Sequence, residues 1–165
     1  MDYIWHYDSP LGGMMMGSDG ESLTGLWFGG QKFFRNTLCE TAEKKQLPVF
    51  EDTCRWLEIY FSGRNPGFMP SLKLSGTPFR MSVWRILLSI PYGHTLTYGD
   101  IARQIAAERG VHTMSAQAVG GAVGHNPISI IVPCHRVIGT DGSLTGYAGG
   151  MDRKIWLLRH EAAVL

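Results

Sequence analysis

The sequence is short of the features that mark several classes of protein. It has only three cysteines in 165 residues, Cys39, Cys54 and Cys134. Three thiols cannot all pair with one another, and their spacing fits no zinc-binding pattern, so we expect no bound metal. Reduced thiols are typical of cytoplasmic proteins, and we expect this protein in the cytoplasm.

Long apolar runs are also missing. No run approaches the roughly 20 residues that a membrane-spanning helix needs, so we expect no membrane partner. The first ten residues, MDYIWHYDSP, lack the basic start and apolar core of a secretory signal. Hydrophobic residues nevertheless make up 44% of the chain and charged residues 18%, which is the composition of a folded soluble protein.

The sequence has almost no excess of positive over negative charge, since its formal net charge is +1. Residues 1–75 carry seven Lys and Arg against nine Asp and Glu, whereas residues 76–165 carry eight against five. A nucleic-acid partner would therefore need local contacts, shared with helix N-termini and backbone N–H groups. The asymmetry alone does not predict such a partner.

The first part of the chain, residues 1–75, is predicted to be an α/β domain that ends in a linker. The turn-rich SPLGG follows the first strand-like run, and two strand-like runs flank the dipeptide Asp19-Gly20, which indicates a hairpin there. A helix is expected from Pro48 to an end at Gly63, with an apolar stripe of Phe50, Cys54, Leu57 and Phe61. The Pro-, Gly- and Ser-rich stretch 64–78 is predicted to be the linker.

The second part, residues 76–165, is predicted to be helical around a helix-turn-helix unit. Thr77-Pro78 is typical of a helix start, and Thr97 with Asp100 predicts a capping box on a helix that ends at Gly110. Ser115 is expected to cap a second short helix, 116–124. The stripe of the first helix is expected at Phe79, Val83, Leu87 and Ile90.

Two further elements complete this part. Asp141-Gly142 predicts a β-ribbon, or wing, within residues 140–150. A terminal helix is expected within residues 151–165, with Asp152 as its N-cap and an inward stripe of Ile155, Leu158 and Ala162. Glu161 falls at the edge of that stripe, so we expect its carboxylate to be partly buried and to have a partner.

The helix at 116–124 is unusually rich in small residues, Ala116, Ala118, Gly120, Gly121, Ala122 and Gly124. Glycine inside a helix costs about 1 kcal/mol relative to alanine. Such a run is explained if something bulky approaches the helix backbone, or if a neighbouring helix packs tightly against it. The helix by itself does not decide between these two interpretations.

The stretch VPCHRV, 132–137, places a cysteine directly before a histidine and an arginine. A thiol with the ordinary pKa of about 8.5 is only a few per cent thiolate at neutral pH, so a nucleophilic cysteine needs a base or a positive field. His135 and Arg136 are candidates, and Glu161 could orient the imidazole. Contact between Cys134 and His135 requires a turn at Pro133–His135 or an intervening water.

A bare Cys-His dipeptide is more often structural than catalytic. The wider pattern favours chemistry, because GGAVGHNPISIIVPCHRVIG, GSLTGYAGG and KIWLLRHE together resemble the O6-alkylguanine-DNA alkyltransferases. The resemblance covers most of 76–165, and the NP…PCHRV run is specific to that family and its non-catalytic alkyltransferase-like relatives. Residues 1–75 match less distinctively.

The resemblance implies an α+β fold, with an N-terminal ribonuclease-H-like domain and a C-terminal winged helix-turn-helix domain. It implies DNA repair by irreversible transfer of an alkyl group from O6-alkylguanine to a cysteine, with base flipping and no cofactor. The implied partner is the minor groove of double-stranded DNA, and we expect a monomer. A soft thiolate suits attack on a saturated carbon, and the thioether has no easy leaving route, so each molecule should act once.

The resemblance also implies catalytic roles for single residues. Cys134 would be the nucleophile, and His135 would deprotonate it through a water. Glu161 would hold His135, and Asn126 would support the turn that carries the cysteine. Tyr98 would donate a hydrogen bond to the departing guanine. From this relay we predict a Cys134 pKa below that of a free cysteine.

The remaining residues that the resemblance implies bind base or DNA. Tyr147 would lie over the flipped base, with Val137, Ala148 and Gly149 lining the pocket. The expected DNA contacts come from Ala116, Gln117, Gly120, Gly121, Arg136 and Thr97. Gln117 stands where the family usually has an arginine that replaces the flipped base, and it brings no charge and less reach.

Two alternatives were left open by the residues themselves. The first is a non-enzymatic damage-recognition or regulatory DNA-binding module on the same scaffold, which the loss of the arginine favours. Retention of Cys134, His135 and Glu161 together argues against it. The second is a cysteine hydrolase, which is disfavoured because no separate oxyanion hole or substrate cleft is indicated.

Overall fold

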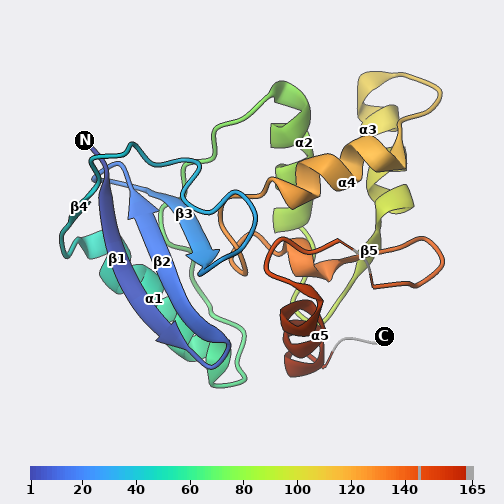
Figure 1. Ribbon diagram of the computed structural model, residues 1–165. Helices are drawn as coiled ribbons and strands as arrows, with labels where there is room; N and C mark the ends of the chain where they lie inside the picture. The colour runs from blue at the N-terminus through green and yellow to red at the C-terminus, as the bar shows by residue number, and fades with distance from the viewer. Residues whose placement is uncertain (145, 163–165) are drawn as a thin grey trace. The chain divides into compact units, whose positions relative to one another are not determined.

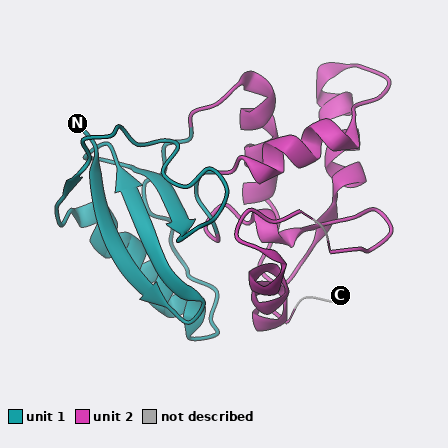
Figure 2. Cartoon of the chain, in the orientation of Figure 1, with its two compact units in different colours: residues 1–74, 127–129 teal, residues 75–126, 130–165 magenta. Residues whose placement is uncertain are grey.

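The computed structural model describes residues 1–144 and 146–162 (Figure 1). These residues form two compact units (Figure 2). The N-terminal unit comprises residues 1–74 and 127–129, and the C-terminal unit comprises residues 75–126 and 130–165. Within the described ranges, no helix is both long enough and apolar enough to cross a membrane.

The N-terminal unit is built on a four-stranded sheet in the order β3-β2-β1-β4. Its strands are β1 (Tyr3–Ser9), β2 (Gly12–Ser18), β3 (Leu23–Phe28) and the short β4 (Glu43–Lys44). Neighbouring strands β1 to β3 run antiparallel, and β4 runs parallel to β1. The hairpin predicted at Asp19-Gly20 is confirmed, since the Asp19 carboxylate accepts the N–H groups of Glu21 and Ser22 and closes the turn.

Helix α1 (Pro48–Phe61) lies along one face of this sheet (Figure 1). The expected stripe is right in part, because Phe50 and Leu57 are fully buried whereas Cys54 and Phe61 are only half-buried. The helix instead turns Trp56 and Tyr60 inward, and their rings stack with centroids 5.3 Å apart. Large aromatic side chains gain more from burial than a thiol does, which explains the rotation of the face.

The outer edge of β3 is covered by two segments from outside the sheet. Within the predicted linker, the Leu23 N–H donates to the Ser71 carbonyl (2.7 Å), and the Lys73 N–H donates to the Leu23 carbonyl (2.9 Å). Residues 127–129 bind farther along the same edge, where the Leu26 N–H donates to Pro127 O and the Ser129 N–H donates to Leu26 O, both at 2.9 Å. These bonds satisfy backbone groups that an open edge would leave unpaired.

Four helices dominate the C-terminal unit, α2 (Pro78–Leu88), α3 (Tyr98–Arg109), α4 (Ala116–Gly124) and α5 (Met151–His160). The predicted caps at Thr77, Thr97 and Ser115 are confirmed, and each side chain accepts a backbone N–H from the first turn. Helices α3 and α4 form the expected helix-turn-helix, and α2 packs against α4. The indole N–H of Trp84 donates to the Ala122 carbonyl at 2.9 Å, so one face of the small-residue helix is used for packing.

The predicted β-ribbon at 140–150 is wrong for the residues that the structure describes there. Residues 139–144 and 146–150 contain no strand, and a tight turn forms in which the Gly139 N–H donates to the Ser143 carbonyl (2.7 Å). The local backbone bonds are made inside the turn, so no partner strand is needed. Two-residue strands instead pair in parallel, β5 (Leu96–Thr97) with β6 (Val137–Ile138).

The last helix also differs from the prediction. Gly150, with φ 96°, is the N-cap of α5 in place of Asp152, which lies within the first turn and makes no capping bond. The inward face of α5 consists of Lys154, Leu157 and Leu158, whereas Ile155 is half-buried and Ala162 is exposed. The helix therefore starts at Met151, two residues earlier than it would with Asp152 as N-cap. Its buried face includes one charged residue, Lys154.

Candidate active site

The chain reaches Cys134 through a strained and fully buried segment. Ile130 has φ 69°, a left-handed conformation that a β-branched residue rarely adopts and that costs about 1–3 kcal/mol. At Pro133 (φ −82°, ψ 64°) the Cys134 N–H donates back to the Val132 carbonyl at 2.8 Å, which is an inverse γ-turn. A 3₁₀ turn, η1 (Cys134–Arg136), follows, so the turn expected at Pro133–His135 is present.

Asn126 holds the segment that precedes Cys134 through a hydrogen bond to Val132. Its side chain is buried, and its Nδ2 donates to the Val132 carbonyl at 2.8 Å. The backbone N–H of Asn126 donates to Val123 in the last turn of α4. One residue thus ties the end of α4 to the turn that precedes Cys134.

Three buried side chains form a hydrogen-bonded network next to the cysteine. The Nε2 atom of His135 lies 2.6 Å from Glu161 Oε2. Arg136 donates to both carboxylate oxygens of Glu161, from Nε at 2.8 Å and from the second terminal nitrogen at 3.1 Å. The backbone N–H of Gly93 donates to Oε1 at 3.1 Å, so the carboxylate is fully satisfied.

The protonation states of this network follow from its contacts. Burial alone would raise the pKa of Glu161, but the hydrogen bonds and charges of His135 and Arg136 outweigh burial and hold that pKa well below its usual range. Burial lowers the pKa of His135, and Glu161 only partly offsets it. A neutral imidazole beside a carboxylate must donate from Nε2, so Nδ1 is left as an acceptor. His135 is therefore set up as a base.

Cys134 itself is buried, with 4% of its surface exposed. Burial raises the pKa of its thiol, although a hydrogen bond from Asn126 and the positive charge of Lys154 both act to lower it. The prediction of a pKa below that of a free cysteine is therefore wrong for the protein without substrate. The thiol rests neutral because desolvation outweighs the nearby positive charge.

Lys154 lies next to Cys134, although it was not among the residues predicted for the site. Its side chain is fully buried, and its ammonium donates to the Val137 carbonyl at 2.5 Å. Burial lowers the pKa of Lys154 to about 8, and the nearby Cys134 partly offsets that effect. The signal was present in the sequence, because Lys154 precedes Leu157, Leu158 and Glu161 by three, four and seven residues and so shares their helix face.

We expect Lys154→Met to stabilise the fold and to raise the pKa of the Cys134 thiol further. The folded pKa of about 8 is lower than that of an unfolded lysine, so stability rises with pH between about 8 and 10.4 and the ammonium costs stability below that window. Chemical denaturation at pH 7 should show a free energy of unfolding higher by about 1–2 kcal/mol. The pH at which Cys134 becomes reactive should move upward, since its cation is gone. A less stable variant would contradict this expectation.

Arg136, which the sequence analysis assigned to DNA contact, has a different place. Its side chain is buried, and its guanidinium is committed to Glu161 and, through one terminal nitrogen at 2.7 Å, to the Ile90 carbonyl. The 3₁₀ turn at 134–136 rotates the side chain inward, which an extended strand would not do. The prediction that Arg136 contacts DNA is therefore corrected to a structural role within the network.

Tyr98, at the start of α3, lies next to α4 and to Gly146. Its hydroxyl donates to the Gly146 carbonyl at 3.4 Å, and its ring is so near Gly120 that a Cβ there would lie 3.8 Å away. Burial raises the pKa of Tyr98, and the charge of a Cys134 thiolate raises it further, so the hydroxyl stays protonated as a donor.

The other predicted substrate-binding residues are buried to different degrees. Val137 and Gly149 are buried, and Tyr147 and Ala148 are half-buried. The Gly149 carbonyl accepts from Arg153 at 3.0 Å, which anchors the loop to the first turn of α5. Val137 directly follows η1, and Tyr147, Ala148 and Gly149 come shortly before α5. All four therefore lie next in sequence to the elements that carry the buried network.

The residues predicted to touch DNA divide by exposure. Ala116, Gln117 and Gly121 are exposed on α4, and Gly120 is half-buried against Tyr98. Thr97 caps α3, with its backbone N–H bonded to Asp100 at 3.0 Å. Helix α4 therefore packs through Val119, Ala122 and Val123, and it exposes only part of its small residues, including Ala116 and Gly121. The packing of one face supports the interpretation that a neighbouring helix lies tightly against the run, and the approach of a bulky partner to the exposed face stays a prediction.

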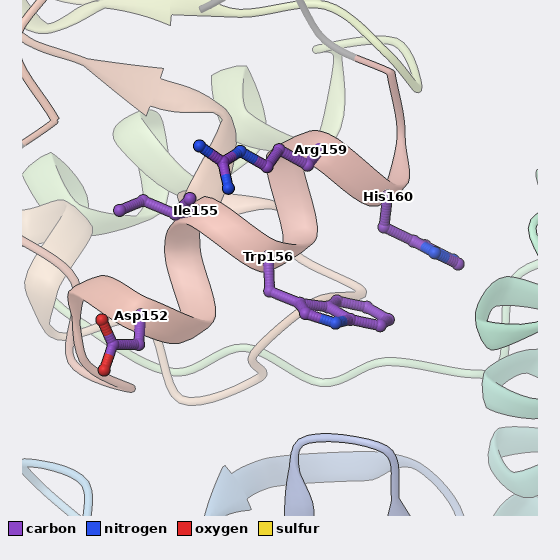
Figure 3. A pocket seen from close by; sticks show the side chains of 5 residues that line it. All are labelled: Asp152, Ile155, Trp156, Arg159 and His160. Carbon is purple, nitrogen blue, oxygen red and sulfur yellow. The ribbon is translucent and has the colours of Figure 1, made fainter.

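A hollow elsewhere on the C-terminal unit does not belong to this chemistry. It has a volume of about 590 Å³ and lies along the side of α5 that carries Asp152, Ile155, Trp156, Arg159 and His160 (Figure 3). Two of its lining side chains, Trp156 and His160, stack with ring centroids 4.7 Å apart. The inward face of α5, with Lys154 and Leu157, points the other way.

Family comparison matches both parts of the chain. The ribonuclease-like domain of 6-O-methylguanine DNA methyltransferase matches residues 3–74, and the DNA binding domain of the same family matches residues 78–163. The methylated-DNA–protein-cysteine methyltransferase of Haemophilus influenzae is 41% identical over 96% of this chain and 86% of its own length. The protein of that name from Mycobacterium bovis is 45% identical over 94% of this chain and 92% of its own.

The fold has solved counterparts as well. The crystal structure of Mycobacterium tuberculosis OGT in complex with DNA superposes with a TM-score of 0.84 at 43% identity, covering 97% of this chain and 92% of that one. An O6-methylguanine DNA methyltransferase from Methanococcus jannaschii superposes with a TM-score of 0.63 at 28% identity, covering 98% of this chain and 95% of that one. Similarity therefore extends across both units.

Proposed function

The chain belongs to the 6-O-methylguanine DNA methyltransferase family, and we propose that Cys134 is the residue that accepts the alkyl group. The protein repairs DNA by taking the alkyl group of an O6-alkylguanine onto one of its own cysteines. The observation that carries the assignment to Cys134 is the buried network beside it, in which Glu161 lies 2.6 Å from His135 and leaves Nδ1 of His135 as the acceptor.

The reaction follows from the protonation states. His135 takes the thiol proton through a bridging water, and the charge of Lys154 stabilises the thiolate that results. The sulfur then attacks the alkyl carbon, forming an S–C bond as the C–O bond breaks. The electrons of that bond stay on the guanine oxygen, and the Tyr98 hydroxyl donates to the departing base. The thioether has no ready leaving group, so one molecule acts once.

The guanine must leave the duplex to reach a buried sulfur. Unstacking costs a few kcal/mol, which contacts with the flanking DNA must offset. We place these contacts on the exposed side of α4, at Ala116, Gln117 and Gly121, with Thr97 nearby at the start of α3. The small residues there suit close approach to the minor groove. Tyr147, Val137, Ala148 and Gly149 line the pocket for the flipped base.

We further propose that the protein works as a monomer in the cytoplasm and needs no metal or cofactor. Each step of the reaction has a protein group of its own, namely Cys134, His135, Glu161, Lys154 and Tyr98. Among residues 1–144 and 146–162, no group of three His, Cys, Asp or Glu side chains is placed to hold a metal ion. The retained cysteine and its network argue against a purely DNA-recognising module.

Intact-mass measurement tests the proposal directly. After incubation with a duplex that contains O6-methylguanine, the protein should gain the mass of one methyl group, and peptide mapping should locate it on the peptide with Cys134. The yield should stop at one methyl per molecule, and an unmodified guanine duplex is the control. A methyl group on Cys39 or Cys54, or none at all, would contradict the assignment.

A further inference from the structure

The segment before the catalytic cysteine is held by the N-terminal unit, which contains none of the residues assigned to catalysis. Residues 127–129 belong to that unit and bind the edge of β3 through Leu26, as described above. A bridge also pairs Leu26 with Ile128. The held segment ends at Ser129, five residues before Cys134.

Gln31 adds a side-chain contact to this edge. Its Oε1 accepts the Phe28 N–H at 2.7 Å and the Ser129 hydroxyl at 3.3 Å. Both Gln31 and Ser129 are buried, and the Gln31 N–H donates to the Phe28 carbonyl at 3.3 Å. The glutamine is therefore folded back onto the end of β3, and its Oε1 atom is held where the Ser129 hydroxyl can donate to it.

The contact matters because the next residue is strained. Ile130 holds φ 69°, and such a conformation persists only where the surroundings over-determine it. Ser129 is fixed on the N-terminal side of Ile130 by its backbone bond to Leu26 and its hydroxyl bond to Gln31. Val132 is fixed on the C-terminal side by Asn126. Without the bonds on both sides, Ile130 would be free to leave its strained conformation, and the turn before Cys134 would lose its support.

We infer that Gln31, acting through Ser129, is a positioning residue for alkyl transfer to Cys134. It is not among the residues proposed to contact DNA or base, and it sets the geometry of the sulfur by holding the start of the strained segment. This inference rests on the proposed function of Cys134. It extends that function, because a residue of the ribonuclease-like part becomes a determinant of the chemical step.

The test is a set of single-turnover measurements on the full chain with a saturating O6-methylguanine duplex. Gln31→Met keeps the shape and removes the acceptor, and it should slow methylation of Cys134 roughly tenfold, since small misplacements of reacting atoms are costly. The duplex concentration that gives half-maximal rate should change less than about twofold, because DNA contact is untouched. Ser129→Ala should slow the step to a smaller extent, and Ser129→Thr, which keeps the hydroxyl, should restore it.

The matched control is Thr53→Val in α1. Thr53 is buried in the same unit and donates to the Val49 carbonyl at 2.7 Å, so its loss lowers the stability of the unit without touching residues 127–129. Its methylation rate should equal that of the wild type. Equal slowing of Thr53→Val and Gln31→Met, or a wild-type rate in Gln31→Met, would overturn the inference. If Gln31→Met fails to fold, Ser129→Ala carries the test, because it leaves the bond between Gln31 and Phe28 intact.

The outcomes separate this inference from the function beneath it. A wild-type protein that takes up no methyl group would refute the proposed function, whatever the variants do. A wild-type protein that is methylated on Cys134, together with an unimpaired Gln31→Met, would refute only the positioning role.

Discussion

Cys134→Ser should take up no methyl group from an O6-methylguanine duplex, a loss on the order of 10⁴-fold or more. A serine hydroxyl has a far higher pKa than a thiol, and an oxygen is a poorer nucleophile toward a saturated carbon. The network of His135, Glu161 and Arg136 does not depend on the sulfur for any of its hydrogen bonds, so the fold should be preserved. Intact-mass measurement over long incubation gives the result.

The same variant should still bind DNA. The proposed DNA contacts lie on the exposed side of α4, with Gln117, and do not involve the sulfur. Titration with a labelled duplex should therefore give an affinity within about twofold of the wild type. Cys54→Ser is the matched control, because Cys54 is a half-buried thiol of α1 and should leave methyl transfer unchanged. Residual methylation of the Cys134→Ser protein at a wild-type rate would show that another residue is the acceptor.

Glu161→Gln should lower the transfer rate on the order of 10³–10⁴-fold, because it reverses the tautomer of His135. The carboxylate accepts from Nε2 of His135 at 2.6 Å, whereas an amide nitrogen placed there would donate. His135 would then carry its proton on Nδ1 and could no longer take one from Cys134. Single-turnover rates measured from pH 6 to pH 9 would show the loss, and the rate should recover partly at high pH, where the thiol ionises without a base.

The same substitution should also destabilise the fold by about 3–5 kcal/mol, because it leaves the buried charge of Arg136 without its partner. The lowered pKa of Glu161 means that its contribution is complete above the unfolded value of about 4.3 and is lost only as the pH falls well below it. Wild-type stability should therefore fall steeply in that acid range, and the variant should lack this slope.

A surface pair provides the comparison. Arg85 and Glu108 lie 3.2 Å apart with both side chains exposed, so Glu108→Gln should change stability by less than about 1 kcal/mol. Equal losses from Glu108→Gln and Glu161→Gln would mean that burial is not what makes the Glu161 network important.

Local features of the fold could be predicted from the sequence. The caps at Thr77, Thr97 and Ser115 are confirmed because capping depends on two or three neighbouring residues. The β-ribbon at 140–150 was not found among the described residues there, because a turn sequence does not reveal whether a partner strand exists. The rotation of α1 toward Trp56 and Tyr60 likewise depends on what the helix packs against.

The site shows the same division. Glu161 could be recognised from its position relative to Leu157 and Leu158, and its burial with a partner is confirmed. Lys154 obeys the same spacing but was overlooked, because a fully buried lysine is rare and a helix pattern is ordinarily read from its apolar residues. The inward direction of the Arg136 side chain depends on the 3₁₀ turn at 134–136, and the sequence pattern does not predict that turn.

The burial of Cys134 has a consequence for a molecule that works once. Oxidants and stray electrophiles consume accessible thiolates first, and each such event would waste a whole protein. Cys39 lies exposed, whereas Cys134 is sheltered and neutral at rest. If Cys134 is the acceptor, as proposed, its burial and raised pKa should protect it from oxidation better than the exposed Cys39 is protected.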